Sequence, residues 1–412
     1  MSHMTPTFVI VGASLAGATA ANALREHGFD GRVVLIGDEA RRPYERPPLS
    51  KEYLRGEKDF NATAVHSADF YDEREIELRT STVVTSIDPT KRLVALSSGE
   101  HITFDRLLLT TGATPRRLSI PGADLEGVYY LRSVNDADTL RQVITPSARV
   151  VVIGAGWIGA EVAASARQLG ADVAMVELAS VPLERVLGWE VGAIYRDLHQ
   201  RHGVDLHLGV GVDTIIGSTT VQGVRLSDGT VLAATVVVVG IGVLPSVELA
   251  EKAGLTIDNG IVVDEHLATS APGIFAAGDV ANAFHPRYGK RIRLEHWSAA
   301  LNQGPAAARS MLDHHIVYDR TPYFFSDQYD LGMEYRGWAP DFDRVVLRGD
   351  PAGGAFLSFW FRHGRVAAAM NVNVWDAGDA IETLLWTDRP IDPALLADPQ
   401  VDLVQFTNSL VN

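Results

Sequence analysis

The chain of 412 residues contains no cysteine. This absence excludes a disulfide framework, a cysteine nucleophile, a CxxC redox pair and any thiolate metal site. Positive charge is also scarce, since 36 Lys and Arg stand against 51 Asp and Glu, for a formal net charge of −15. A general nucleic-acid binder needs a net basic surface, so we expect no nucleic-acid partner.

Long apolar runs are missing as well. No stretch approaches the roughly 18 uncharged apolar residues that span a bilayer, and the longest, residues 233–243, is expected to be a buried strand. The apolar run at residues 8–12 has no basic region before it and no signal-peptidase site close behind it. We therefore expect a cytoplasmic protein with no membrane partner, large enough for two or three domains.

A strand, a glycine turn and a helix follow one another twice. The β-branched residues 7–11 precede G-A-S-L-A-G at residues 12–17 and an alanine-rich helical stretch. Residues 150–153 precede G-A-G-W-I-G at residues 154–159 and a second alanine-rich stretch. This order is that of the Rossmann unit. The two fingerprints lie too far apart for one small sheet and predict two separate dinucleotide sites.

The second unit predicts an NADH site. Gly154 permits the tight turn, Gly156 lets the backbone approach a pyrophosphate, and Gly159 lets the helix pack on the strand. Glu177 ends the next strand, where a carboxylate bonds the ribose hydroxyls and repels a 2′-phosphate. Residues 178–180 supply no arginine for that phosphate. These features favour NADH over NADPH; a glycine turn without a ligand is the alternative.

The first unit departs from the ideal fingerprint. Ser14 replaces the middle glycine, which is tolerable because serine adds little bulk and its hydroxyl can reach a phosphate. Alignment of the two units places Gly37 opposite Glu177, and the carboxylate follows one position later, at Asp38. We expect this unit to hold a second, tightly bound dinucleotide through Asp38.

A third motif identifies that dinucleotide as FAD. Residues 273–279, G-I-F-A-A-G-D, form a short apolar strand that ends in Gly-Asp. In flavoproteins with two dinucleotide domains, this late Asp279 position bonds the FAD ribityl chain, and the N-terminus of the following helix faces the flavin. An Asp that caps a strand–helix turn is the alternative.

Shorter β-rich segments complete the expected domains. The first domain is expected to contain strands at residues 77–86, 92–96 and 107–110. The second is expected to contain strands at residues 205–208, 223–226 and 236–239. From about Tyr323 the composition changes and predicts a third domain, with aromatic strands at residues 356–361 and 365–373 followed by two helices.

Over essentially its whole length, the sequence resembles the NADH-dependent, FAD-containing ferredoxin reductases of oxygenase systems. The most specific segment is P-Y-E-R-P-P-L-S-K at residues 43–51, and others lie at residues 110–113, 130–132, 242–245, 295–297 and 325–329. The resemblance implies an α/β, glutathione-reductase-like fold with two Rossmann-like dinucleotide-binding domains and a C-terminal α+β domain. The boundaries it implies are residues 1–114 with 245–322 for FAD, 115–244 for NADH and 323–412 for the interface domain.

The resemblance also implies the site residues. It places Lys51 and Glu161 as catalytic residues at the flavin–nicotinamide junction, where we expect an ion pair between them; it implies no metal. The FAD contacts would be Gly12, Ser14, Ala16, Gly17, Asp38, Arg46, Pro48, Lys51, Val84, Thr111, Gly112, Arg132, Asp279 and Trp297. The NADH contacts would be Gly154, Gly156, Ile158, Gly159, Glu161, Glu177 and Gly242. From the residues alone, a surface ion pair for Arg46 and Arg132 and core packing for Trp297 remain open.

The function implied is an NADH:ferredoxin oxidoreductase. FAD would take hydride from NADH and pass single electrons to a [2Fe–2S] ferredoxin that serves a cytochrome P450 or a Rieske oxygenase. The alternatives are a flavin-only NADH oxidase or quinone reductase, and a redox-sensing protein that binds FAD and NADH. The ferredoxin would dock on a basic stretch, Arg287, Lys290, Arg291 and Arg293, extended by Arg336, Arg344 and Arg362. A solvated basic loop paired with nearby acids is the alternative there.

Overall fold

The computed structural model describes residues 5–387 and 389–411. Its residue contacts divide the chain into two compact units. Unit 1 comprises the described residues up to Pro47 together with Asp59–Thr114 and Val243–Arg320. Unit 2 comprises Pro48–Lys58, Pro115–Gly242 and the described residues from Thr321 onward. The three domain boundaries expected from the sequence stay a prediction.

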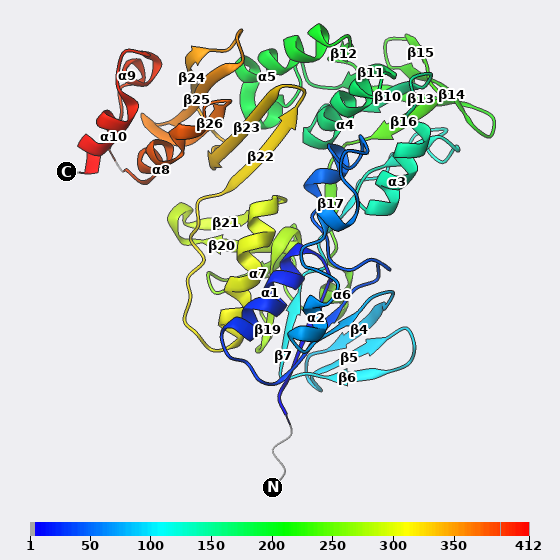
Figure 1. The fold of residues 1–412 in the computed structure, drawn as a ribbon, viewed down its shortest axis with the longest axis vertical. Coiled ribbons are helices and arrows are strands. Elements are labelled where there is room, and N and C mark those ends of the chain that lie inside the picture. Colours follow the sequence, from blue (N-terminus) through cyan, green and yellow to red (C-terminus); the bar gives the residue numbers. More distant parts are fainter. Residues whose placement is uncertain (1–4, 388, 412) are drawn as a thin grey trace. The chain divides into compact units, whose positions relative to one another are not determined.

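Unit 1 is built on a five-stranded parallel sheet in the order β19-β7-β1-β2-β3. Figure 1 labels two of its strands, β7 and β19. Apart from the edge strand β3, the strands of this sheet are almost continuous apolar runs, as expected when both faces of a parallel sheet are covered. Their bounds are β1 (Thr7–Val11), β2 (Arg32–Ile36), β3 (Ile76–Arg79), β7 (Arg106–Leu109) and β19 (Ile274–Ala276).

Two helices of unit 1 cross at very short distance. Helix α1 (Leu15–Glu26) packs against α7 (Trp297–Met311). A Cβ added at Gly304 would lie only 2.3 Å from the carbonyl oxygen of Ala16, so glycine is required at this crossing. The remaining elements of unit 1 are α2 (Phe70–Glu73), α6 (Glu248–Lys252), β4 (Val84–Asp88), β5 (Leu93–Leu96), β6 (His101–Thr103), β18 (Ile261–Val263), β20 (Ala281–His285) and β21 (Lys290–Arg293).

Unit 2 contains a second five-stranded parallel sheet, in the order β12-β11-β10-β16-β9. Its strands are β9 (Val128–Tyr130), β10 (Arg149–Ile153), β11 (Asp172–Glu177), β12 (Asp205–Leu208) and β16 (Val236–Val239). The helices beside them are α3 (Val134–Val143), α4 (Trp157–Gln168) and α5 (Glu184–Arg201). An antiparallel sheet follows, with β13 (Val212–Gly217), β14 (Val221–Leu226) and β15 (Val231–Ala233).

The C-terminal part of unit 2 is an antiparallel sheet in the order β22-β23-β26-β25-β24. The indole N–H of Trp360 on this sheet donates to the carbonyl of Leu187 on α5, at 2.9 Å, which fixes the sheet to that helix. Its elements are β22 (Tyr323–Gln328), β23 (Leu331–Gly337), β24 (Arg344–Asp350), β25 (Ala355–Arg362), β26 (Arg365–Val372), α8 (Gly378–Trp386), α9 (Pro393–Ala397) and α10 (Leu403–Val411).

Several local expectations were wrong. Residues 77–86 form two strands, β3 and β4, because the chain turns between them at Ser81, whose φ is +49°. Residues 233–243 are divided among β15, β16 and β17 (Val243–Pro245), which pairs with β8 (Ala113–Pro115). Three helices, α8, α9 and α10, follow β26 in place of two.

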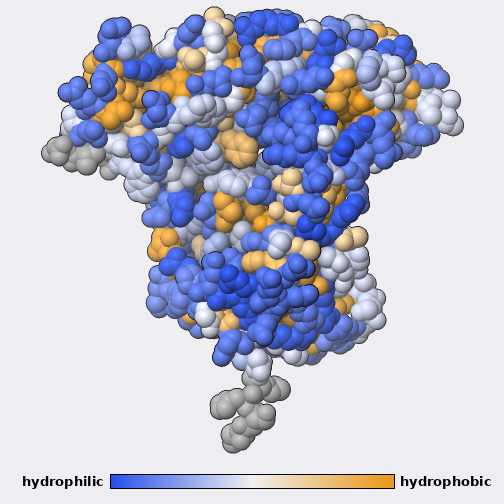
Figure 2. All heavy atoms as spheres, viewed as in Figure 1, coloured by the Kyte–Doolittle hydropathy of each residue, from blue (hydrophilic) through white to orange (hydrophobic). Residues whose placement is uncertain are grey.

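The Gly-Asp motif also continues differently from the expectation. Residues Gly278–Val280 form a short 3₁₀ turn that leads directly into β20, and the next helix, α7, begins only at Trp297. Asp279 therefore neither caps a helix nor directly precedes one. No helix among the described residues is long and apolar enough to cross a bilayer. Hydrophilic residues cover most of the face shown in Figure 2.

Candidate functional site

The glycine turn of unit 2 forms an open backbone cradle. Gly154, with φ +98°, turns the chain from β10 toward α4. A Cβ on Gly159 would lie 1.9 Å from the carbonyl oxygen of Gly154, whereas a Cβ on Gly156 would meet nothing closer than 4.0 Å. Gly159 is thus needed for packing, and Gly156 leaves space above the N-terminus of α4. This arrangement fits the pyrophosphate of a dinucleotide.

Glu177 lies at the end of β11, beside this turn. Its Oε2 accepts a hydrogen bond from the backbone N–H of Ala155 at 2.7 Å, and its Oε1 accepts one from Ala179 at 3.0 Å. A carboxylate has about four acceptor positions, so two remain for ribose hydroxyls. The next residue, Leu178, is 77% exposed and offers no charge to a 2′-phosphate.

Two further predicted NADH contacts, Ile158 and Gly242, also lie in unit 2. Ile158 follows the cradle in the first turn of α4 and is exposed. Gly242, with φ +97°, accepts a hydrogen bond from the backbone N–H of Arg116. Both residues belong to the same unit as Glu177 and the glycine turn.

A buried charged pair in unit 2 joins Lys51 to Glu161 of α4. Nζ of Lys51 is 3.6 Å from Oε1 of Glu161, and the two residues are only 3% and 5% exposed. The ion pair expected from the sequence is therefore confirmed. Its role beside a cofactor stays a prediction.

The structure adds partners to this pair that sequence reasoning missed. The hydroxyl of Ser50 donates to Oε2 of Glu161 at 2.5 Å, and that of Ser326 donates to Oε1 at 2.7 Å. Asp327 approaches Lys51 to 3.6 Å, and the ring centroid of Phe325 lies 4.7 Å from its Nζ. These residues lie in the segments 43–51 and 325–329, so the motifs predicted which segments contribute to the site but not the contacts between their side chains.

The glycine turn of unit 1 forms a cradle as well. Gly12 has φ +120°, and an added Cβ would lie 2.1 Å from the carbonyl oxygen of Thr110. A Cβ on Gly17 would lie 2.1 Å from the carbonyl oxygen of Gly12. Ser14 precedes α1 without capping it through its side chain, and the buried Ala16 lies in the first turn. The backbone here fits a second dinucleotide, and Asp38 stands exposed just after β2.

The other predicted FAD contacts divide between the units. Within unit 1, Arg46 forms an ion pair with Glu39 at 2.9 Å, and the Thr111 hydroxyl donates to the carbonyl of Ser246 at 2.7 Å. The remaining predicted contacts in unit 1 are Val84 at the start of β4, Gly112 with φ +69°, Asp279 and Trp297. The predicted contacts in unit 2 are Pro48, Lys51 and Arg132.

The basic stretch of unit 1 contains fewer available cations than the sequence suggests. The side chain of Arg293 is 10% exposed and forms an ion pair with Glu295 at 2.5 Å. Its Nη1 also donates to the carbonyl of Asp279. Arg291 is exposed, with its guanidinium 5.9 Å from the Phe284 ring centroid. In unit 2, Arg336 pairs with Glu334 at 3.0 Å.

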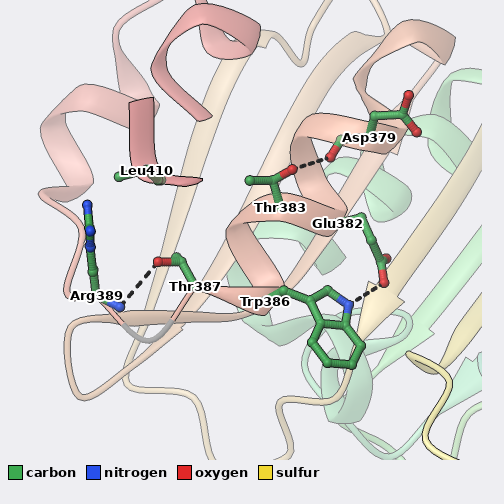
Figure 3. A pocket seen from close by; sticks show the side chains of 7 residues that line it. All are labelled: Asp379, Glu382, Thr383, Trp386, Thr387, Arg389 and Leu410. Carbon is green, nitrogen blue, oxygen red and sulfur yellow. Dashed lines mark hydrogen bonds between the residues drawn. The ribbon is translucent and has the colours of Figure 1, made fainter. Parts of the chain in front are cut away.

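An open pocket of about 620 Å³ lies between α8 and the C-terminal helix (Figure 3). In it, the indole N–H of Trp386 donates to Glu382 at 2.6 Å. The lining residues are Asp379, Glu382, Thr383, Trp386, Thr387, Arg389 and Leu410, none of which was predicted as a site residue. The part of the chain that the structure describes contains no cluster of three or more His, Asp or Glu suited to a metal ion.

Comparison with known proteins decides the family. Residues 6–304 match the model of the pyridine nucleotide-disulphide oxidoreductases, and residues 323–407 match that of the reductase C-terminal domain. This chain belongs to the pyridine nucleotide-disulphide oxidoreductases. The α/β fold expected from the sequence is confirmed.

Several relatives within the family match over almost their entire length. Rhodocoxin reductase of Rhodococcus erythropolis is 39% identical, over 96% of this chain and 93% of its own. The ferredoxin–NAD(+) reductase component of an anthranilate 1,2-dioxygenase system from Burkholderia cepacia is 39% identical, over 97% and 98%. A solved covalent complex of putidaredoxin reductase with putidaredoxin matches with a TM-score of 0.94 at 37% identity, over 98% and 99%. The resemblance stated from the motifs is confirmed.

Proposed function

We propose that this chain is an NADH:ferredoxin oxidoreductase with FAD as its resident cofactor. Bound FAD supplies the conversion between two-electron and one-electron transfer that joins NADH to an iron–sulfur partner. The partner is a [2Fe–2S] ferredoxin that serves a cytochrome P450 or a Rieske oxygenase. Relatives named as reductases of dioxygenase systems, and a neighbour solved with putidaredoxin, support this partner class. The three-domain division, with boundaries near residues 114, 244 and 322, and a cytoplasmic location belong to the proposal.

The choice of NADH rests on the arrangement around Glu177. Its carboxylate is fixed by two backbone N–H groups beside an open glycine turn, so it stands ready for ribose hydroxyls without reorganisation. A negative charge there disfavours the 2′-phosphate of NADPH. We assign the nicotinamide dinucleotide to Gly154, Gly156, Ile158, Gly159, Glu161, Glu177 and Gly242.

We assign FAD to the glycine cradle of unit 1. The glycine turn at Gly12 and Gly17 supports this because no side chain fits there. The full set is Gly12, Ser14, Ala16, Gly17, Asp38, Arg46, Pro48, Lys51, Val84, Thr111, Gly112, Arg132, Asp279 and Trp297. Lys51 and Glu161 are assigned as the catalytic pair.

The test is the reduction of an added [2Fe–2S] ferredoxin. The FAD-loaded protein is mixed with NADH and ferredoxin without oxygen, and the iron–sulfur absorbance is followed in a stopped-flow instrument. We expect rapid ferredoxin reduction with NADH and much slower reduction with NADPH. Rapid turnover with oxygen or a quinone but none with a panel of ferredoxins would favour the NADH oxidase or quinone reductase. Slow turnover with every acceptor would favour the redox-sensing alternative.

A further inference from the structure

A chain of buried polar side chains leads from α5 to the carboxylate of Glu161. Nε2 of His199 lies 2.9 Å from Oε1 of Gln328, and Nε2 of Gln328 lies 3.4 Å from Oγ of Ser326. Ser326 in turn reaches Oε1 of Glu161 at 2.7 Å. All four residues are buried and belong to unit 2. Ser326 and Gln328 lie two residues apart on β22, so they face the same side of the strand.

The hydrogen bonds in this chain have one direction. An ionised carboxylate only accepts, so the hydroxyl of Ser326 donates to Glu161. The amide nitrogen of Gln328 donates to Ser326, which leaves its carbonyl oxygen to accept from His199. Nε2 of His199 therefore carries the hydrogen, and Nδ1 is free to accept from the hydroxyl of Tyr329, 3.4 Å away. Every donor in the chain points toward Glu161.

This chain of hydrogen-bonded side chains is suited to stabilising a charge rather than to transferring a proton. Gln328 stands in its middle, and an amide does not readily give up and regain a proton. Burial lowers the pKa of His199 to about 4, so its ring stays neutral at physiological pH. The dipoles of neutral donors aligned toward a carboxylate favour its charged form in a poorly solvated site.

The other groups around Glu161 fit a fixed negative charge. Lys51 and Ser50 approach it, and Asp327 approaches Lys51 from the more exposed side. Arg55 adds positive charge near Asp327. Burial, reinforced by the charges of Glu161 and Asp327, raises the pKa of Tyr195, so its hydroxyl remains neutral.

We propose that His199, Gln328 and Ser326 are positioning residues that hold the carboxylate of Glu161 oriented toward Lys51 during NADH oxidation. The proposal rests on the function proposed above and assigns these residues no contact with substrate or cofactor. It requires the rate of flavin reduction by NADH to depend on the placement of the Glu161 carboxylate.

The first test compares two buried serines of the same sheet. Ser326→Ala removes the last donor of the chain. Ser358→Ala removes a fully buried hydroxyl on β25 that has no hydrogen-bond partner among the described residues, and it serves as the matched control. The rate of flavin reduction by NADH in the FAD-loaded proteins is measured from about pH 5 to 9. We expect the rate of Ser326→Ala to fall by about tenfold, the equivalent of one hydrogen bond to a charged group. We expect the profile of Ser358→Ala to match the wild type.

Overlapping profiles for Ser326→Ala and the wild type, in proteins of equal flavin content, would overturn the proposal. If NADH does not reduce the flavin of the wild-type protein at all, the proposed function is refuted instead. The second readout needs neither turnover nor a folded Ser326 variant. In FAD-loaded wild type labelled with ¹⁵N-histidine, the His199 signal is identified by its loss in His199→Asn. It should report an Nε2–H tautomer that stays neutral down to about pH 4. An Nδ1–H tautomer, or a charged ring at pH 6, would contradict the direction of the chain.

Discussion

Nζ of Lys51 lies 3.6 Å from Oε1 of Glu161, and both side chains are buried. Two opposite charges removed from water stabilise each other, and the loss of one partner leaves the other uncompensated. This relationship makes the pair sensitive to single substitutions and much less sensitive to a double one.

Lys51→Met should lower the free energy of unfolding by about 3–5 kcal/mol, because it leaves a buried carboxylate unpaired. Lys51→Met combined with Glu161→Gln should recover part of this loss, and both variants should take electrons from NADH slowly. Denaturant unfolding and flavin content measure the effect. Lys58→Met is the control, since Lys58 is partly exposed and 3.9 Å from Glu52; it should change stability by less than about 1 kcal/mol. Equal losses for Lys51→Met and Lys58→Met would contradict the burial argument.

Two glycines in the cradle of unit 2 have different roles: Gly159 is needed for packing, and Gly156 for dinucleotide binding. Gly159→Ala places a Cβ 1.9 Å from the carbonyl oxygen of Gly154, so we expect poor folding or a large drop in the melting temperature. Gly156→Ala meets no atom closer than 4.0 Å, so we expect a normal melting temperature. Because the new methyl group occupies the approach to a pyrophosphate, NADH affinity should fall at least tenfold. Calorimetric titration with NAD⁺, which does not reduce the flavin, checks this, and unchanged affinity in Gly156→Ala would place the dinucleotide elsewhere.

Glu177→Ala should reduce the preference for NADH over NADPH by about tenfold to a hundredfold, since it removes the ribose contact and the charge that repels a 2′-phosphate. The ratio of kcat/KM for the two dinucleotides measures the preference. Glu184→Ala is a suitable control because Glu184 also accepts backbone N–H groups, those of Ser180 and Val181, but lies outside the predicted ribose position. The assignment fails if the wild type uses NADPH as well as NADH.

The sequence predicted the features that depend on neighbouring residues. The turns at Gly12 and Gly154 and the carboxylate of Glu177 belong to contiguous strand–turn–helix units, whose geometry is local. The turn at Ser81 was missed because a serine with positive φ gives no sequence signal. Contacts such as Ser326 with Glu161 were also missed, because they join residues 165 positions apart and depend on how β22 packs in unit 2.

The family resemblance predicted more of the site than the local sequence patterns did. It identified segments of the chain, but not most of the side-chain contacts within them. It marked residues 325–329 and predicted the Lys51–Glu161 pair, yet it gave no reason to connect His199 with either. A lone histidine on a helix is not distinguished by spacing, and its role follows only from burial and from its position opposite Gln328. Pairing of the basic stretch with nearby acids was stated as an alternative, but not which arginine would pair, because a run of basic residues in a sequence does not show where each side chain lies.

His199 should make stability depend on pH. Burial lowers the pKa of His199 to about 4, whereas an unfolded histidine titrates near 6.5. Below pH 6.5, His199 binds a proton in the unfolded protein but stays neutral in the folded protein. The free energy of unfolding therefore decreases as the pH drops toward 4. The pKa shift corresponds to a loss of about 3 kcal/mol in the free energy of unfolding once the pH is below the pKa of the folded state. His199→Gln should show a smaller decrease in melting temperature between pH 7.5 and 4.5 than the wild type. Parallel decreases would mean that other groups dominate acid unfolding, such as His296, whose pKa desolvation also lowers to about 4.

Ferredoxin docking should depend on Arg291 more than on Arg293. Net charge opposes the approach of an acidic ferredoxin to a chain of charge −15, so attraction must come from local cations. Arg293 is neutralised by Glu295, whereas Arg291 is exposed. Arg291→Glu should therefore raise the KM for ferredoxin severalfold and leave the reduction of ferricyanide unchanged, since that small acceptor needs no protein docking. Lys91→Glu, the reversal of another exposed cation of unit 1, should change neither.

Ferredoxin reduction by the wild type should also slow as salt rises, because screening shortens the electrostatic range to about 8 Å at physiological ionic strength, while flavin reduction by NADH stays constant. Equal losses with both acceptors in Arg291→Glu would mean that this arginine supports the cofactor site and not the docking of the partner.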